Sequence, residues 1–166
     1  MKLVSIGIFA ALLSVSSAIA QNPPEVKLTV ASAGPRAVES RTEQTLIRDY
    51  SAAWKSLADA SETSSPALLN AYFTGGAKTT LSRELADQQK TSTHVRYLNQ
   101  THNLTAVFYS PEGDVMQLQD SAEYQMQIVS DEKVIHDEHV VVQYIVLMTP
   151  GADRWVVRQL QAVPAL

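Results

Sequence analysis

The sequence predicts an α+β domain in which N-terminal helices pack on a curved antiparallel sheet of about four strands. Two observations carry this prediction. Between residues 40 and 92, apolar side chains recur at spacings of three and four, the period of an amphipathic helix. From residue 94 onward the chain is rich in β-branched and aromatic residues, with short turn-forming segments between the rich stretches. Helices followed by strands, without alternation, favour separate layers.

Residues 1–20 have the features of a cleavable signal peptide. Lys2 gives a short positive segment, an apolar run follows from Leu3 to Leu13, and Ala18-Ile19-Ala20 fits the small-x-small pattern of a cleavage site. An uncleaved anchor is the less favoured alternative, because the second half of the segment is rich in serine. We expect cleavage after Ala20, a secreted or periplasmic location, and no membrane attachment of the mature chain.

The composition limits the classes of partner. The sequence has no cysteine, so even in an oxidising compartment its stability must come from packing alone. It carries 13 basic and 17 acidic residues, so removal of Lys2 leaves a net charge of about −5. A negative chain is repelled by nucleic acid and by anionic lipid, and neither is expected as a partner.

Residues 21–39 are expected to form a flexible linker. Four prolines and glycines lie there among small polar residues, without a sustained helical period. A short edge strand within residues 25–30 is the less favoured alternative, because the segment is short and follows two prolines. A single domain is then expected over residues 40–166, and removal of the linker is expected to change its stability little.

Three helices are expected at the start of this domain. Ser40-Arg41-Thr42-Glu43 fits a capping box, and an apolar stripe continues from there to about residue 60. Ser65-Pro66 begins a short second helix, which Gly75-Gly76 is expected to end. Residues 77–92 form a third helix with a weaker apolar side.

The strands are expected to form an antiparallel meander. Turn-forming segments lie around residues 110–114, 130–133 and 149–153. Short connections of this kind join neighbouring antiparallel strands. The four expected strands are Leu104–Tyr109, Val115–Val129, His139–Met148 and Arg154–Val163.

Asp120 is the candidate catalytic residue. In the strand 115–129 the even-numbered residues share one side, which is apolar except for Asp120. Burial would raise the pKa of this carboxyl group and suit it to general acid or base catalysis. Two alternatives stay open: a hydrogen-bonded structural role, and a β-bulge near Ser121 that turns Asp120 towards solvent.

Aromatic residues with polar tips are candidates for the wall of a ligand cavity. An arginine in the last strand is a candidate partner for an anionic ligand or for Asp120. For aromatic residues at helical spacing, an ordinary core position is the alternative. The ligand-binding candidates are Tyr50, Trp54, Tyr72, Tyr124, Tyr144 and Arg158.

No metal site and no cofactor are expected. His136 and His139 would point to opposite sides of a strand, so their segment is interpreted as a solvated turn. The sequence has no G-x-S-x-G, Walker or G-x-G-x-x-G motif and no cysteine nucleophile. Asn99 and Asn103 begin glycosylation sequons, which matter only in a host that modifies asparagine.

The order of elements resembles the nuclear transport factor two-like and SnoaL-like superfamily, whose cone-shaped fold is cystatin-like. The resemblance rests on the aromatic-rich helix at 46–57, the long strands at 115–129 and 139–148, and Asp153-Arg154-Trp155-Val156-Val157. This last run is similar to the turn and tryptophan-led final strand of the superfamily. The resemblance allows a homodimer formed through the exposed face of the sheet, here the glutamine-rich side of 115–129.

Two functions follow as hypotheses. The first is an exported, non-catalytic domain that binds a small apolar molecule or an envelope protein. The second is a cofactor-independent isomerase, dehydratase or cyclase, because the resemblance implies such roles for pocket carboxylates. Asp120 would then be the acid or base, and Tyr50 or Tyr144 would donate a hydrogen bond.

Overall fold

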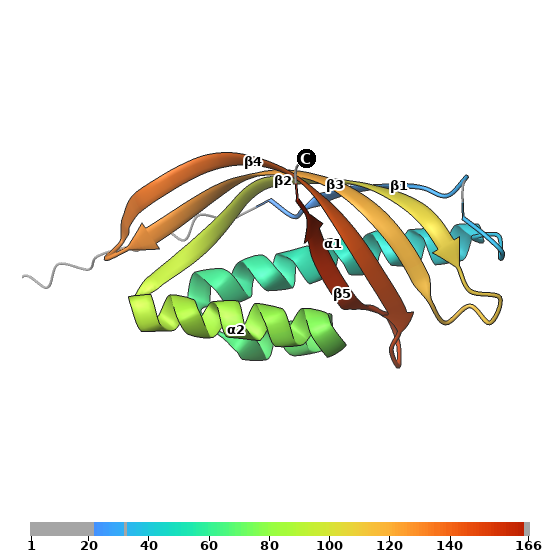
Figure 1. Ribbon diagram of the computed structural model, residues 1–166, viewed down its shortest axis with the longest axis horizontal. Helices are drawn as coiled ribbons and strands as arrows, with labels where there is room; N and C mark the ends of the chain where they lie inside the picture. Colours follow the sequence, from blue (N-terminus) through green and yellow to red (C-terminus); the bar gives the residue numbers. More distant parts are fainter. Residues whose placement is uncertain (1–21, 32, 165–166) are drawn as a thin grey trace, which may run out of the picture.

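The computed structural model describes residues 22–31 and 33–164, so the predicted signal peptide lies outside the described residues. The α+β class is confirmed: the strands form one arched layer, and the α-helices lie beneath its concave side (Figure 1). No helix in the described ranges is long and apolar enough to cross a membrane. The elements are β1 (Glu25–Thr29), α1 (Ser40–Thr63), the 3₁₀ helix η1 (Pro66–Ala71), α2 (Gly75–Thr91), β2 (Thr93–Tyr109), β3 (Met116–Ser130), β4 (Lys133–Pro150) and β5 (Trp155–Val163).

The sheet has five strands in the order β1-β2-β3-β4-β5, where about four were expected. Strands β2 to β5 pair as an antiparallel meander. The additional strand β1 pairs parallel to β2, with Leu28 opposite Leu104. Residues 25–29 of the expected linker therefore belong to the sheet. The alternation of Val26, Leu28 and Val30 explains this, since all three pack against the core.

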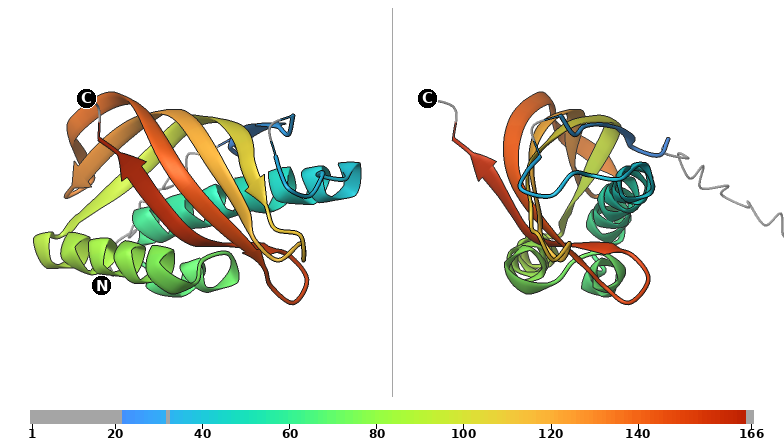
Figure 2. Two further views of the ribbon diagram at one scale, coloured as in Figure 1. Left: turned by 45° about the vertical axis from the view of Figure 1, so that its right-hand side comes forward. Right: turned by 90° about the vertical axis from the view of Figure 1, so that its right-hand side faces the viewer.

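The sheet curves around the helices in both views of Figure 2. Its bending coincides with irregular pairing: β2 shifts register against β3 between Leu98 and Thr101 and again between Ala106 and Phe108. Asn99 in the first shift has φ 53°, a left-handed conformation that asparagine tolerates better than most residues. Such bulges bend a strand and increase its twist. The concave side thus encloses the core against α1 and α2.

The helices follow the predicted apolar pattern but not the predicted caps. α1 buries Leu46, Trp54 and Leu57. It begins at Ser40 as expected, yet the N-cap residue is Glu39 and no side chain caps the helix, so the capping-box prediction is wrong. The glycine pair opens α2 where we expected it to end the preceding helix. Gly75 has φ 54°, which lets the chain turn sharply from η1 into α2.

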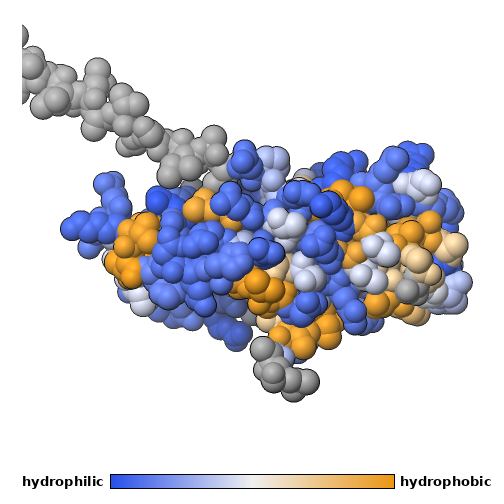
Figure 3. Space-filling view, turned by 90° about the horizontal axis from the view of Figure 1, so that it is seen from above, coloured by the Kyte–Doolittle hydropathy of each residue, from blue (hydrophilic) through white to orange (hydrophobic). Residues whose placement is uncertain are grey.

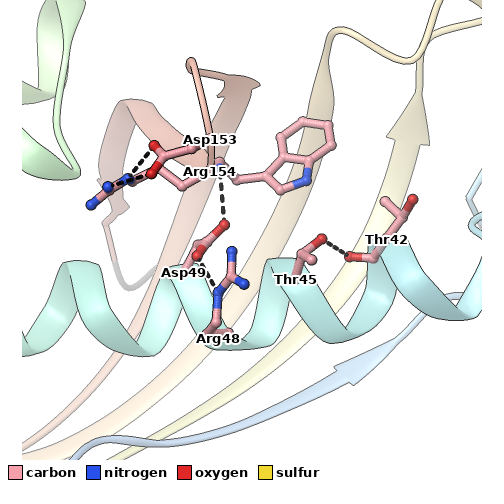
Figure 4. Close-up of polar contacts among 7 residues, drawn as sticks. Thr42, Thr45, Arg48, Asp49, Asp153 and Arg154 are labelled. Carbon is pink, nitrogen blue, oxygen red and sulfur yellow. Dashed lines mark hydrogen bonds and ion pairs between the residues drawn. The ribbon is translucent and has the colours of Figure 1, made fainter.

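Asp49 connects α1 to β5 through a buried hydrogen bond (Figure 4). Its carboxylate is buried and accepts a hydrogen bond from the backbone N–H of Trp155 at 2.8 Å. Nε of Arg48 donates to the other carboxylate oxygen, also at 2.8 Å. A buried carboxylate is costly unless it is hydrogen-bonded. The start of β5 is therefore held at a defined place on α1.

We expect β1 to stabilise the domain. Leu28→Ala should lower the free energy of unfolding by about 1–2 kcal/mol, because it removes a partly buried side chain that packs on the core. Lys27→Ala, which changes the exposed neighbour, should stay within about 0.5 kcal/mol of the parent. Urea unfolding followed by circular dichroism measures both. Equal stability of the two variants would mean that β1 is not part of the folded sheet.

Candidate functional site

A buried polar cluster lies where α1 crosses β2 and β3. The hydroxyl group of Tyr50 donates a hydrogen bond to Oδ2 of Asp120 at 2.8 Å. Nδ1 of His102 lies 2.8 Å from the same oxygen. All three side chains are 0% exposed. β3 pairs regularly with β4 through Ser121, so Asp120 points inward, as the alternation predicted, and the bulge alternative does not hold.

Burial keeps the hydroxyl group of Tyr50 in this cluster protonated. Burial raises the pKa of Tyr50 well above its usual range, and the nearby carboxylate of Asp120 adds to the rise. Tyr50 therefore stays protonated and donates. Nε2 of His102 and Oδ1 of Asp120 have no hydrogen-bond partner among the described residues.

Trp54 lies between the buried cluster and an open pocket. Its ring packs over the imidazole of His102, with 4.4 Å between ring centroids. It also contacts Tyr97 and Tyr144, at centroid distances of 6.2 Å and 5.6 Å. The hydroxyl of Tyr144 lies 2.9 Å from that of Tyr124, so this aromatic layer carries its own hydrogen bond. Trp54 thus contributes to the cluster on one side and to the pocket on the other.

The pocket has a volume of about 620 Å³ and lies under the concave side of the sheet, between α2 and β5. Its wall combines apolar and aromatic side chains with polar side chains from α2 and β5. The apolar lining consists of Trp54, Leu57, Ala77, Leu81, Tyr97, Tyr144, Leu147, Leu160 and Ala162, and the polar lining of Thr80, Glu84, Arg158, Gln159 and Gln161.

Two charged side chains border this pocket. Arg158 on β5 is exposed and does not pair with Asp120, whose hydrogen-bonding oxygen faces Tyr50 and His102. A Cβ atom at Gly75 would come within 3.1 Å of the Cγ of Arg158, so the glycine leaves room for the arginine at the start of α2. Glu84 lines the pocket from α2, and burial raises its pKa, while Arg83 acts in the opposite direction.

The structure divides the sequence-predicted ligand residues into three groups. Trp54, Tyr144 and Arg158 line the pocket. Tyr50 and Tyr124 are buried behind it, and Asp120 lies in the buried cluster. Tyr72 lies elsewhere, with the guanidinium group of Arg154 5.2 Å from its ring centroid.

Sequence reasoning missed His102, Tyr97 and Glu84. His102 alternates with Leu104 and Ala106, so the period of two contained a signal for its inward position. Tyr97 has the opposite parity and reaches the concave side only because the register shifts between Leu98 and Thr101. For Glu84, nothing in the sequence pattern except its position on a helix indicates that it lines the pocket.

The histidines near the start of β4 lie on the surface. His136 is 3.1 Å from Glu138 and His139 is 3.2 Å from Glu123. They belong to a strand, so the predicted turn is wrong for this segment, and their side chains are half exposed. In the described part of the chain, no three or more histidine, cysteine, aspartate or glutamate residues are grouped so that they could hold a metal ion.

Comparison with known proteins supports the fold. No family model matches the chain, and the search of curated proteins finds no match. Among solved structures, the chain is similar to the crystal structure of the intermembrane space region of the chloroplast protein ARC6. The TM-score is 0.62 at 12% sequence identity, over 79% of this chain and 100% of that chain. At this identity the similarity concerns the α+β fold alone.

Trp54→Ala should lower the free energy of unfolding by about 3–5 kcal/mol, because the ring is 2% exposed and its loss leaves a cavity between α1 and the sheet. The neighbouring Lys55→Ala changes an exposed side chain and serves as the control. Chemical unfolding of both variants measures the difference. A loss below about 1 kcal/mol for Trp54→Ala would contradict its place in the core.

Alkaline pH should destabilise the fold. Burial raises the pKa of four of the six tyrosines above the usual value of about 10. In the unfolded chain these groups ionise near pH 10, so their contribution is complete below that pH and is lost as the pH rises through their folded values. The four residues are Tyr50, Tyr97, Tyr124 and Tyr144.

Urea unfolding between pH 8 and 12 measures this dependence, with absorbance at 295 nm reporting tyrosine ionisation. Tyr97→Phe should reduce the slope of stability against pH above 10, since it removes one of the shifted groups. Normal ionisation of all tyrosines near pH 10 in the folded protein would contradict the burial described here.

Proposed function

We propose that this chain is an exported, non-catalytic binding protein whose pocket holds a small apolar molecule with one anionic group. The observation that carries the proposal is the 620 Å³ pocket with an aromatic wall and Arg158 at its border. Pockets for small organic ligands have volumes of about 300–1,000 Å³ and combine an apolar wall with a few polar groups. This pocket has the size of such a site, and its lining combines aromatic and aliphatic side chains with polar ones.

The wall favours a planar or aliphatic apolar body. Tyr97 from β2 and Tyr144 from β4 present partly exposed aromatic rings to the pocket, and Trp54 from α1, which is 2% exposed, lies behind them. Their contacts with one another and with His102 hold them in place. A wall that is already ordered costs little conformational entropy when a ligand binds.

The charges favour an anionic group on the ligand. Arg158 borders the pocket, and a guanidinium group binds a carboxylate, sulfonate or phosphate group through charge-assisted hydrogen bonds. Glu84 opposes an anion when it is ionised. Because burial raises the pKa of Glu84, we expect binding of an anionic ligand to strengthen as the pH falls towards that pKa.

Export and family membership belong to the same proposal. Export is supported by the signal-peptide pattern of residues 1–20. Membership of the SnoaL-like superfamily is supported by helices beneath a curved sheet and by a pocket on the concave side. The cone-shaped, cystatin-like description is proposed on the same grounds.

Catalysis by Asp120 is the weaker alternative. Its carboxylate is 0% exposed and does not belong to the pocket wall. A molecule in the pocket meets Trp54 and Tyr144, behind which the cluster lies. The hydrogen bonds from Tyr50 and His102 give Asp120 a structural role that requires no substrate.

Two naphthalene dyes test the proposed ligand class. 8-Anilino-1-naphthalenesulfonate carries an anionic group, and N-phenyl-1-naphthylamine is the same apolar body without it. We expect Trp155→Phe, which leaves Trp54 as the single tryptophan, to show quenching of Trp54 by both dyes, with tighter binding of the sulfonate. Arg158→Gln should weaken sulfonate binding about tenfold and leave the uncharged dye unchanged, since it removes one charge-assisted contact.

Matched variants locate the binding. Thr80→Phe fills the pocket from α2 and should abolish binding of both dyes, whereas Thr79→Phe adds the same ring at the exposed neighbouring position and should not. Arg154→Gln removes an arginine that pairs with Asp153 outside the pocket and should leave both affinities unchanged. Binding that is insensitive to Thr80→Phe, or no saturable binding at all, would refute the proposed site.

A further inference from the structure

β4 extends beyond its neighbour β5 and leaves a free edge of the sheet. β5 ends with Val163 opposite Gln143, whereas β4 begins at Lys133 and pairs with β3 along its length. Within the described chain, residues 133–142 therefore have a paired strand on one side only. Figure 1 shows this part of β4 at the left-hand end of the sheet, away from β5.

This edge lacks proline, and its central charges do not exclude pairing with a second copy. Proteins protect such edges with proline, charged side chains (lysine above all) or β-bulges. The charged residues near the middle of this edge are Asp137 and Glu138, and Asp137 meets a histidine in the pairing described below. Here Lys133 and a register shift opposite Ile128 affect only the first residues of β4, and no proline lies between residues 133 and 142. Ile135 and Val141 are 62% and 67% exposed, more than any other large hydrophobic residue of the described chain. An open edge flanked by exposed apolar side chains is suited to pairing with another strand.

The sequence of the edge is complementary to itself. In an antiparallel pair centred on Glu138, Asp137 of each copy lies opposite His139 of the other copy. The same register brings Ile135 opposite Val141 at both ends. Two carboxylate–imidazole pairs are thus flanked by two apolar pairs. A symmetric dimer requires this kind of self-complementary surface.

The charge states and neighbours of the β4 side chains affect these contacts. Hydrogen bonds from Gln125 and Gln127 lower the pKa of Asp137, so its carboxylate stays ionised and accepts a hydrogen bond. At the centre, the two Glu138 carboxylates would repel each other. Nε2 of His136 lies 3.1 Å from Oε2 of Glu138 in the same chain, and both side chains are half exposed, so solvent and salt screen this repulsion.

We propose that two copies of this chain form a homodimer in which the free edges of β4 pair antiparallel about Glu138, joining the two five-stranded sheets into one. This dimer differs from pairing through the exposed face of the sheet. Seen from above, that face is largely hydrophilic, and its hydrophobic patches are separate from one another (Figure 3). A stable face-to-face contact needs a larger continuous apolar surface.

Disulfide trapping tests the dimer and its register in the full chain, which has no cysteine of its own. In the proposed register the two Cα atoms at position 138 lie about 4.5–5.5 Å apart, within the range of a disulfide. The two positions 136 are offset by four residues, about 13 Å along the strand. Under mild oxidation, Glu138→Cys should form a covalent dimer at least about tenfold faster than His136→Cys. Both positions are exposed, so both variants should fold.

Sedimentation velocity of the cysteine-free protein tests the association itself. The parent should show a concentration-dependent dimer, and Val141→Lys should raise its dissociation constant at least about tenfold, because symmetry applies the change twice. Gln119→Lys, on the exposed face of β3, should have no effect. A monomer at the highest soluble concentration, equal or reversed trapping rates for the two cysteine variants, or dissociation by Gln119→Lys in place of Val141→Lys would overturn the proposal.

Discussion

The buried carboxylate of Asp120 sets the geometry on which the rest of the site depends. A carboxylate that is fully buried must be hydrogen-bonded, and its two partners come from different elements, Tyr50 from α1 and His102 from β2. These bonds fix where α1 crosses the sheet. Trp54, one helical turn after Tyr50, is then placed over the imidazole ring of His102. The inner wall of the pocket is therefore a consequence of a polar contact that the pocket itself does not include.

The inward side of β3 could be predicted from the sequence in detail, and that of the irregular strand β2 could not. In β3 the alternation is unbroken from Met116 to Tyr124, so parity alone placed Asp120 on the inner side. In β2 the shift at Asn99 exchanges the two sides. Alternation counted back from the inward-facing Leu104 therefore predicts that Tyr97 faces outward, whereas it faces the concave side of the sheet. A bulge depends on how the strand must bend around the helices, and this is a property of the whole layer.

The boundaries of several helices and strands also could not be predicted from the local sequence. Ser40 begins a helix, but its side chain caps nothing, and Gly75 opens a helix where a glycine pair commonly follows one. The two prolines before β1 and its short length favour a linker there, yet its alternating apolar residues pack on the core and it pairs with β2. For β1 and Gly75 a tertiary contact outweighed the local preference: β1 packs against the core, and Gly75 lies close to Arg158.

The two halves of β4 differ in pairing and burial, and this difference bears on local unfolding of the sheet. Val146 and Met148 lie in the core where β4 pairs with β5, whereas residues 133–139 are exposed and, within one copy, have a strand on one side only. Local opening costs little where few apolar groups are buried and approaches the full unfolding free energy in the core. A single strand thus spans two regimes of amide hydrogen exchange. In a single copy, its first half opens at a lower free-energy cost than its second half, whose side chains at Val146 and Met148 are buried in the core.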